Sequence, residues 1–141
     1  MTSPAVVALK CTTGLDRIDR GEILFYQDGV LSRDGTTGVA VLTAEAVTIY
    51  KGHGDEEISV PITVLGKTEV LMRRRNDTGQ MTQVFTAPAN AGDKLYYEYN
   101  DGTKSVTIST TKGGGALLGI AVHSIGTRTS SVDVIVNFAA A

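Results

Sequence analysis

Apolar and polar residues alternate over short stretches along most of the chain, and glycines separate these stretches at short intervals. A two-residue period is typical of β-strands that bury one face. Val, Ile, Thr and Tyr fill most of the apolar positions, which favours strands over helices. The best helix-like stretch, 42–47, is too short to be stable alone. The pattern therefore predicts an all-β protein.

Turn signals containing Gly, Asp or Asn separate the predicted strands. The predicted strands are 6–10, 23–26, 30–32, 39–42, 46–50, 58–65, 69–73, 82–86, 94–99, 106–110, 117–123 and 132–138. Strands of this length and spacing are typical of a single small β-barrel or β-sandwich of antiparallel strands. We predict that residues 21–141 form this one β-domain.

The first twenty residues have a different pattern, because a short apolar run is followed by a polar, charged stretch without a clear period. We predict that residues 1–20 form an extended N-terminal arm. Such an arm becomes ordered only when it packs against a neighbour.

The stretch ANAGDKLYYEYNDGTKSVTI, 89–108, predicts one hairpin in detail. A two-residue Asp-Gly turn at 101–102 fixes which residues face each other across the two strands. The predicted inner pairs are Leu95 with Ile108 and Tyr97 with Val106. In this register Tyr97 and Tyr99 line the core, and Tyr96 alone faces outwards.

Each of the last two predicted strands has one apolar face, the face that a sheet turns towards its core. The apolar positions are Leu118, Ile120 and Val122 in the first strand, and Val132, Val134, Val136 and Phe138 in the second.

The composition is that of an ordinary globular domain, with 42% hydrophobic and 20% charged residues in 141 positions. A formal net charge of −2 provides no basic field for nucleic acid or an anionic membrane. The longest apolar runs are far shorter than a bilayer span, and no secretion signal is visible. We therefore expect neither a nucleic acid nor a membrane as partner.

Candidate chemical groups are few and do not form a known motif. Cys11 is the single cysteine, and a buried filler role is favoured over a nucleophile. His53 lies beside three carboxylates at 55–57, a pattern that favours a solvated turn over a metal site. The arginines at 73–75 suit a hairpin tip better than a phosphate clamp, because their side chains alternate along a strand. We predict no catalytic, cofactor or metal site.

The last fifty residues resemble a family of tailed-bacteriophage head decoration and head-fibre proteins. That family has an "A-x-A-G-D-x-L-Y" lead-in, a hairpin, a "V-T" strand, a "G-x-A" strand and a closing "V-x-V" strand. The matching residues are Ala89, Ala91, Gly92, Asp93, Leu95, Tyr96, Val106, Thr107, Gly119, Ala121, Val134 and Val136. The first ninety residues match the family only in general character.

The resemblance implies a β-rich virion protein, made in the host bacterial cytoplasm, that binds the outer capsid surface and stabilises the shell as a cement protein. Its partner would be the major capsid protein, and it would form a homo-oligomer, with a trimer favoured. An arm that pairs with a coat strand would act by β-augmentation. Candidate interface residues are Val6, Val7, Leu9, Arg17, Arg20, Arg73, Arg74, Arg75 and Tyr96.

Three other functions remain open at this point. The protein is alternatively a different virion component, such as a head-completion or tail-tube subunit. A carbohydrate-binding β-sandwich would stack sugars on exposed tyrosines such as Tyr96. An enzyme is least favoured, because the sequence offers no convergent set of titratable residues.

Overall fold

The structure, a computed structural model, is all-β, as the sequence predicts. It describes residues 5–15, 17–48, 58–71, 73–75, 81–85, 88–112, 115–125 and 131–137. The strands are β1 (Ala5–Cys11), β2 (Arg17–Ile18), β3 (Ile23–Gln27), β4 (Val30–Ser32), β5 (Val39–Thr43), β6 (Val47–Thr48), β7 (Ile58–Leu71), β8 (Arg73–Arg75), β9 (Met81–Gln83), β10 (Lys94–Asn100), β11 (Ser105–Ser109), β12 (Ala116–Ala121) and β13 (Ser131–Asn137).

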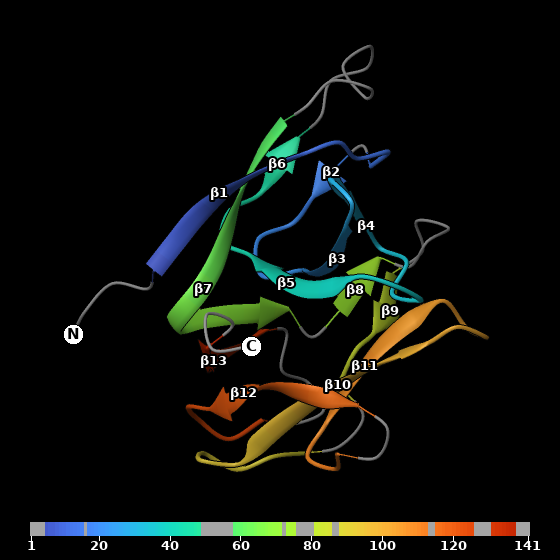
Figure 1. Cartoon of the computed structure of the whole chain (residues 1–141). Helices are drawn as coiled ribbons and strands as arrows, with labels where there is room; N and C mark the ends of the chain where they lie inside the picture. The colour runs from blue at the N-terminus through green and yellow to red at the C-terminus, as the bar shows by residue number, and fades with distance from the viewer. Residues whose placement is uncertain are drawn as a thin grey trace.

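One strongly curled antiparallel sheet of nine strands forms a half-barrel (Figure 1). Its strand order is β11-β10-β12-β13-β7-β5-β3-β4, and β1 also pairs with β7. Two small sheets, β2-β6 and β8-β9, complete the described strands. The predicted class of a small β-barrel or β-sandwich is confirmed. Within the described residues, no helix is long and apolar enough to cross a membrane.

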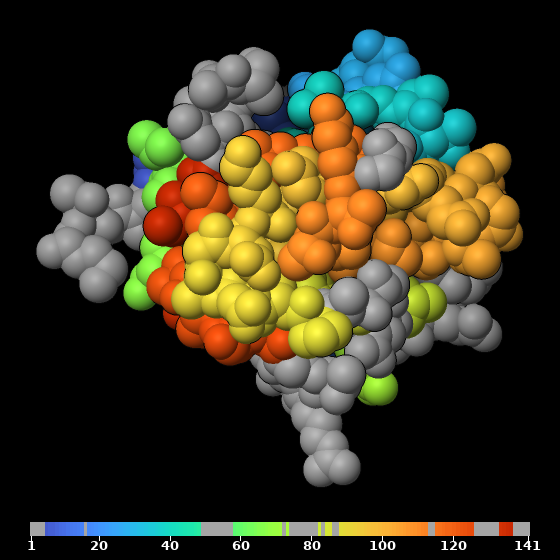
Figure 2. All heavy atoms as spheres, turned by 90° about the horizontal axis from the view of Figure 1, so that it is seen from below, coloured from blue at the N-terminus to red at the C-terminus, as the bar shows by residue number. Residues whose placement is uncertain are grey.

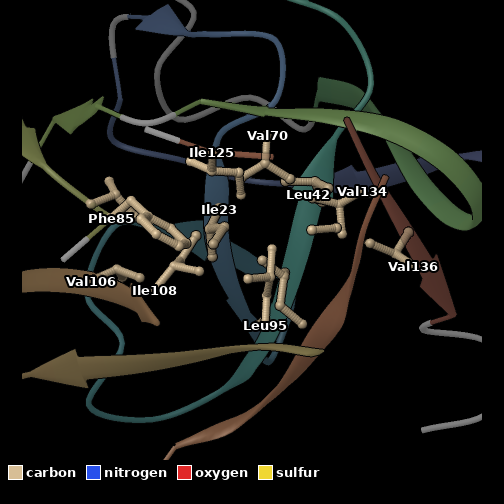
Figure 3. Close-up of a cluster of buried hydrophobic side chains, with 14 of the residues drawn as sticks. Ile23, Leu42, Val70, Phe85, Leu95, Val106, Ile108, Ile125, Val134 and Val136 are labelled. Atoms are coloured by element: carbon tan, nitrogen blue, oxygen red, sulfur yellow. The ribbon is translucent and has the colours of Figure 1, made fainter. Parts of the chain in front are cut away.

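The main core contains side chains from the two halves of the curled sheet (Figure 3). Residues of β3, β5 and β7 meet residues of β10 to β13 there. A second buried cluster, which includes Leu24 and Val60, packs elsewhere in the domain. Along β3, Ile23 and Phe25 belong to the main core and Leu24 to the second cluster. Because both faces of β3 are buried, its apolar residues run without interruption.

The long strand β7 differs from the prediction, which had two strands joined by a turn at residues 65–67. The chain instead continues through Gly66 as one strand, and Gly66 has a φ of 110°. Residues 58–65 pair with β1, and residues 65–71 pair with β13. The predicted turn is wrong because each half of β7 finds its own partner strand on the sheet.

The expected N-terminal arm is part of the domain from Ala5 onwards. Strand β1 pairs with β7 along its whole length, and Cys11 and Ile18 are buried in the second cluster. The expectation that this segment needs a neighbouring molecule to become ordered is therefore wrong for residues 5–11, because β7 supplies the pairing. No break in packing marks a boundary at residue 20, since Gly21 donates its N–H to the carbonyl of Thr43.

Strands β10 and β11 form the predicted hairpin, but the register is shifted by two residues. Tyr97 pairs with Ile108 and Tyr99 with Val106. A shift of two residues leaves every side chain on its predicted face. Tyr97 and Tyr99 therefore pack against the main core as predicted, where the ring of Phe25 lies 6.5 Å from Tyr97 and 5.7 Å from Tyr99.

The cause of the shift is the turn, which takes residues 101–104 instead of two residues. The side-chain oxygen of Asn100 accepts hydrogen bonds from the N–H groups of Gly102 (2.9 Å) and Thr103 (3.2 Å). Lys104 adopts a φ of 56° and returns the chain to β11. Asparagine side chains commonly stabilise turns in this way.

The predicted apolar face of β12 is wrong beyond Leu118. The register with β10 shifts between Leu95 and Tyr96, so that Leu118 is an extra residue in a β-bulge. As a result Leu118 is buried, whereas Ile120 and Val122 are 40% and 37% exposed. In β13 the predicted face is confirmed at Val134 and Val136, which are fully buried in the core, and the side chains of Val132 and Phe138 lie outside the described part of the chain.

A buried ion pair holds the loop after β4 against the start of β3. Arg33 Nε donates to Glu22 Oε2 at 2.7 Å, and both side chains are less than one tenth exposed. A second guanidinium nitrogen of Arg33 donates to the carbonyl of Arg17, and the N–H of Asp19 donates to Glu22 Oε1. The hydroxyl of Thr43 accepts the Glu22 N–H. Each charge is therefore compensated, as buried charges require.

Candidate functional site

Within the described residues, strand β1 has one paired edge and one open edge, and the chain bonds to β4 only directly after the strand, where the N–H of Thr12 donates to Gly29 and the carbonyl of Thr12 accepts from Leu31. Its residues pair with β7 from Leu65 to Ile58, and no other described strand pairs with β1. An open strand edge presents unpaired N–H and C=O groups to any extended chain that reaches it. Residues 5–9 of this edge carry no charged side chain.

Both faces of β1 are also apolar where the strand begins. Val6 is 46% and Val7 is 49% exposed, whereas Leu9 is half-buried against the second cluster. Natural edge strands normally carry a lysine, a proline or a bulge that discourages pairing with other chains. This strand carries neither lysine nor proline before Lys10, although its register with β7 shifts between Ala5 and Val6. Its composition favours pairing.

A third exposed apolar residue, Leu65, lies in β7 on the paired side of β1. Leu65 of β7, which is 46% exposed, pairs with Ala5 at the start of β1 and with Asn137 at the end of β13. The first and the last strand of the described chain, β1 and β13, thus both pair with β7 at Leu65. We define the β1 edge site as Val6, Val7 and Leu65 together with the open backbone of residues 5–9.

The predicted arginines do not join this site. The side chain of Arg17 is 62% exposed and pairs with Asp19 at 2.9 Å, and Arg20 is exposed in the following turn. Arg73 is exposed in β8, which belongs to a separate small sheet with β9. The backbones of Arg74 and Arg75 pair with Thr82 and Met81.

Several predictions fall outside the described residues. The side chains of Arg74 and Arg75 belong to this group, as do the hairpin tip at 76–80 and the acidic loop with His53. The predicted strand at 46–50 is described only over Val47–Thr48.

Tyr96 does not form part of an aromatic platform. It is half-buried on the face of β10 that points away from the main core, where its register partners are Ser109 and Leu117. Tyr97 and Tyr99, the nearest tyrosines, lie on the opposite face of the strand. A flat stacking surface for a sugar ring needs aromatic rings exposed on one face, and the hairpin offers one half-buried ring.

Sequence reasoning missed a second exposed surface, on the outer face of β12 and β13. Ile120 and Ile135 are direct register partners there and are 40% and 49% exposed. Leu117 and Val122 add exposed apolar area at 54% and 37%. Seen from below, β7 (green), β13 (red), β12 (orange) and β10 (yellow) follow one another across the molecule (Figure 2). The bulge at Leu118 turns Ile120 and Val122 outwards, and the alternation of apolar residues in the sequence gives no sign of a bulge.

Two aspartates join the loop after β4 to the β10–β11 turn. Thr36 Oγ1 lies 2.6 Å from Asp34 Oδ1 and 3.2 Å from Asp101 Oδ1. The hydroxyl hydrogen bond from Thr36 lowers the pKa of Asp34. The ammonium group of Lys104, 2.7 Å from Asp101, lowers the pKa of that carboxyl. These contacts are on the surface, and they anchor the turn.

Metal ligands do not converge in the described part of the chain, where no three His, Cys, Asp or Glu side chains form a group able to hold an ion. Cys11 is buried and forms no disulfide. His123 is exposed, and its Nε2 accepts a hydrogen bond from the backbone N–H of Asp133 at 3.2 Å.

The residues that match the phage-protein motif build the fold of the C-terminal half. Gly92 has a φ of 91°, and the Asp93 carboxylate accepts the N–H of Asn90 at 2.9 Å, which closes the turn before β10. Ala89 and Ala121 are buried in the main core. The motif therefore contributes a turn and core positions in this chain.

Comparisons of the chain with protein-family models, with curated proteins and with solved structures find no match.

Proposed function

We propose that this protein is a capsid decoration protein of a tailed bacteriophage, which attaches to the outer surface of the assembled shell through the β1 edge site. The single observation that carries the proposal is the open, uncharged edge of β1 with Val6 46% and Val7 49% exposed. The resemblance of residues 89–138 to head decoration proteins supports it.

An edge of this kind selects its partner by simple chemistry. Backbone hydrogen bonds along β1 would provide affinity for an extended strand of the major capsid protein, and the side chains would provide the specificity. Val6 and Val7 project to opposite faces of the strand, so the partner strand needs apolar residues on both faces. Leu65 extends the apolar contact onto β7.

Symmetry in the shell strengthens such contacts. A capsid presents the same coat strand many times, so a weak single contact becomes a stable attachment when an oligomer of this chain engages several copies at once. Cementing a shell in this way needs no catalytic group.

The direct test mixes the purified full chain with expanded, undecorated shells assembled from the coat protein of the same phage genome. Cryo-electron microscopy should show added density at equivalent sites over the whole outer surface, with β1 next to a coat strand. Density only at one vertex would support a head-completion protein instead, and density along tails would support a tail subunit. Shells that remain bare would contradict the proposal.

The contact itself is tested by charged substitutions on the edge. Val7→Lys and Val6→Lys place a solvated cation where the partner strand must pack, and we expect occupancy on shells to fall by about tenfold or more. Val39→Lys is the matched control, because Val39 is an exposed valine (64%) on β5, away from the β1 edge. Equal occupancy for Val7→Lys and Val39→Lys would overturn the role of β1.

Deletion of residues 1–20 cannot serve as this test. The deletion removes β1 and the buried Cys11 and Ile18, so the sheet and the second cluster lose part of their structure. Loss of binding by such a variant would report misfolding as readily as a lost contact.

A further inference from the structure

We propose that the outer face of β12 and β13 is a contact surface between two copies of this chain. The centre of this face is the pair Ile120 and Ile135, which face each other across the two strands. The proposal does not use the open edge of β1, because β12 and β13 lie in the interior of the sheet order, between β10 and β7.

The exposure of this pair is fixed by the backbone. Leu118 is the extra residue of the bulge, and the next residue, Gly119, is buried against β13. A side chain at Gly119 would place its Cβ against the carbonyl oxygen of Ile135 and 2.6 Å from Val134 Cγ1. Because the backbones of β12 and β13 approach this closely, only glycine fits on the inner side at position 119. The next residue, Ile120, therefore faces outwards.

A solvent-facing sheet face usually carries polar residues at these positions. Here four apolar side chains, Leu117, Ile120, Val122 and Ile135, are each more than one third exposed on neighbouring strands. Because β12 and β13 are paired with strands on both sides, the face offers side chains and no free backbone edge. Its partner must therefore stack face to face on the sheet, as in a β-sandwich.

The charges around the apolar residues point to a second copy as that partner. Lys94 and Lys67 occupy the same row across the sheet as Ile120 and Ile135. The next row along the strands carries the carboxylates of Asp133 and Glu69, which are register partners. Cations and anions thus lie in adjacent rows of one face.

This pattern is self-complementary. The two-fold axis would lie parallel to the sheet, perpendicular to the strands and midway between the two rows. Such an axis would stack β7 on β7 of the second copy. Lys67 would then face Glu69 of the second copy, Ile120 would face Val122 of the second copy, and Ile135 would face Asp133 of the second copy. An isologous interface uses the same patch on both subunits and so needs both signs of charge on that patch. The family resemblance favours a trimer, whereas this face favours a two-fold pair.

The test measures the mass of the full chain in solution by sedimentation equilibrium over a range of concentrations. We expect a monomer–dimer equilibrium, and we expect Ile120→Lys to raise the dissociation constant by about tenfold or more, because the lysine would be desolvated opposite Val122 of the second copy. Val39→Lys, an exposed valine outside this face, should leave the dimer unchanged. A wild-type chain that stays monomeric, or forms a trimer, overturns the proposal.

A charge exchange keeps the proposal falsifiable if Ile120→Lys fails to fold. Lys67→Glu and Glu69→Lys should each weaken the dimer, since each places like charges opposite one another. The double variant Lys67→Glu/Glu69→Lys restores opposite charges only when the partner is a second copy of the same variant. Recovery of dimerisation by the double variant is the expected result, and single variants that dimerise like the wild type would contradict the arrangement.

Discussion

The hydroxyl oxygens of Thr63 and Thr68 lie 3.4 Å apart, although five residues separate them along one strand. Residues five apart on a straight strand would be separated by roughly 16 Å. The bend of β7 at Gly66, with its φ of 110°, brings the two hydroxyls together. It also places β1 and β13 one after the other along the same strand, so the β1 edge site depends on this bend.

We predict that Gly66→Ala destabilises the domain by about 1–3 kcal/mol, because residues with a side chain rarely adopt this φ. Urea unfolding followed by circular dichroism measures the change. The same substitution at Gly14 is the control, since Gly14 has no positive φ and a Cβ there would meet nothing within 4 Å. Equal stability of Gly66→Ala and the wild type would show that β7 bends without needing glycine.

Removing one partner of the buried ion pair should destabilise the domain more than any surface change. Glu22→Gln leaves the Arg33 guanidinium buried without its counter-charge, and we expect a loss of about 3–5 kcal/mol in the free energy of unfolding. Arg33→Met should have an effect of the same size. Chemical denaturation of both single variants measures these losses.

The double variant Glu22→Gln/Arg33→Met distinguishes an ion pair from two separate contacts. Because the second substitution no longer strands a buried charge, the double variant should lose clearly less stability than the sum of the two single losses. A double variant whose loss equals that sum would show that the two side chains act independently. The exposed pair of Arg17 and Asp19 offers a comparison, since Arg17→Met should change stability by less than about 1 kcal/mol.

The sequence predicted side-chain faces better than register or exposure. Tyr97 and Tyr99 line the core as predicted, because an error of two residues in the hairpin register does not change the face of a strand. Ile120 shows the opposite case, since one extra residue in a bulge reverses the face of every later residue in β12. A bulge depends on how neighbouring strands meet, which the local alternation of residues does not record.

The sequence likewise predicted some residues of the candidate sites and missed others. Val6 and Val7 were predicted from an apolar run that lacks charge, and they are exposed on an open edge. The pairing of β1 with β7 was not predicted, because it joins residues that are 47 (Cys11 and Ile58) to 60 (Ala5 and Leu65) positions apart. Glu22 and Arg33 gave no signal in the sequence, since a charged residue beside an apolar run is usually at the surface.

Gly119→Ala should destabilise the domain by about 1–3 kcal/mol, because the backbones of β12 and β13 approach too closely to admit a methyl group. Gly119→Val should cost more than Gly119→Ala, since the added methyl groups meet the same carbonyl oxygen and Val134. Thermal unfolding measures both. The corresponding substitutions at Gly14, which is exposed, should change stability by no more than about 0.5 kcal/mol.

The phenol of Tyr97 should titrate later than an ordinary tyrosine. Burial disfavours the charged phenolate and raises the pKa of Tyr97 above its ordinary value of 10.0. Because the pKa of Tyr97 is higher in the folded than in the unfolded state, the contribution of the buried neutral phenol to the free energy of unfolding is fully present below about pH 10. This contribution is lost as the pH rises through the folded-state pKa. The near-ultraviolet absorbance of phenolate, followed against pH, should therefore show a late phase that coincides with the onset of alkaline unfolding.

Tyr97→Phe separates this titration from the packing of the ring. The phenylalanine keeps the ring beside Phe25, so the fold at neutral pH should be unchanged, whereas the late absorbance phase should disappear and alkaline unfolding should begin at higher pH. Tyr96→Phe, on the opposite face of the same strand, is the control and should leave the late phase in place. A late phase that survives Tyr97→Phe would assign the buried phenol to another tyrosine and contradict the packing of Tyr97 against the core.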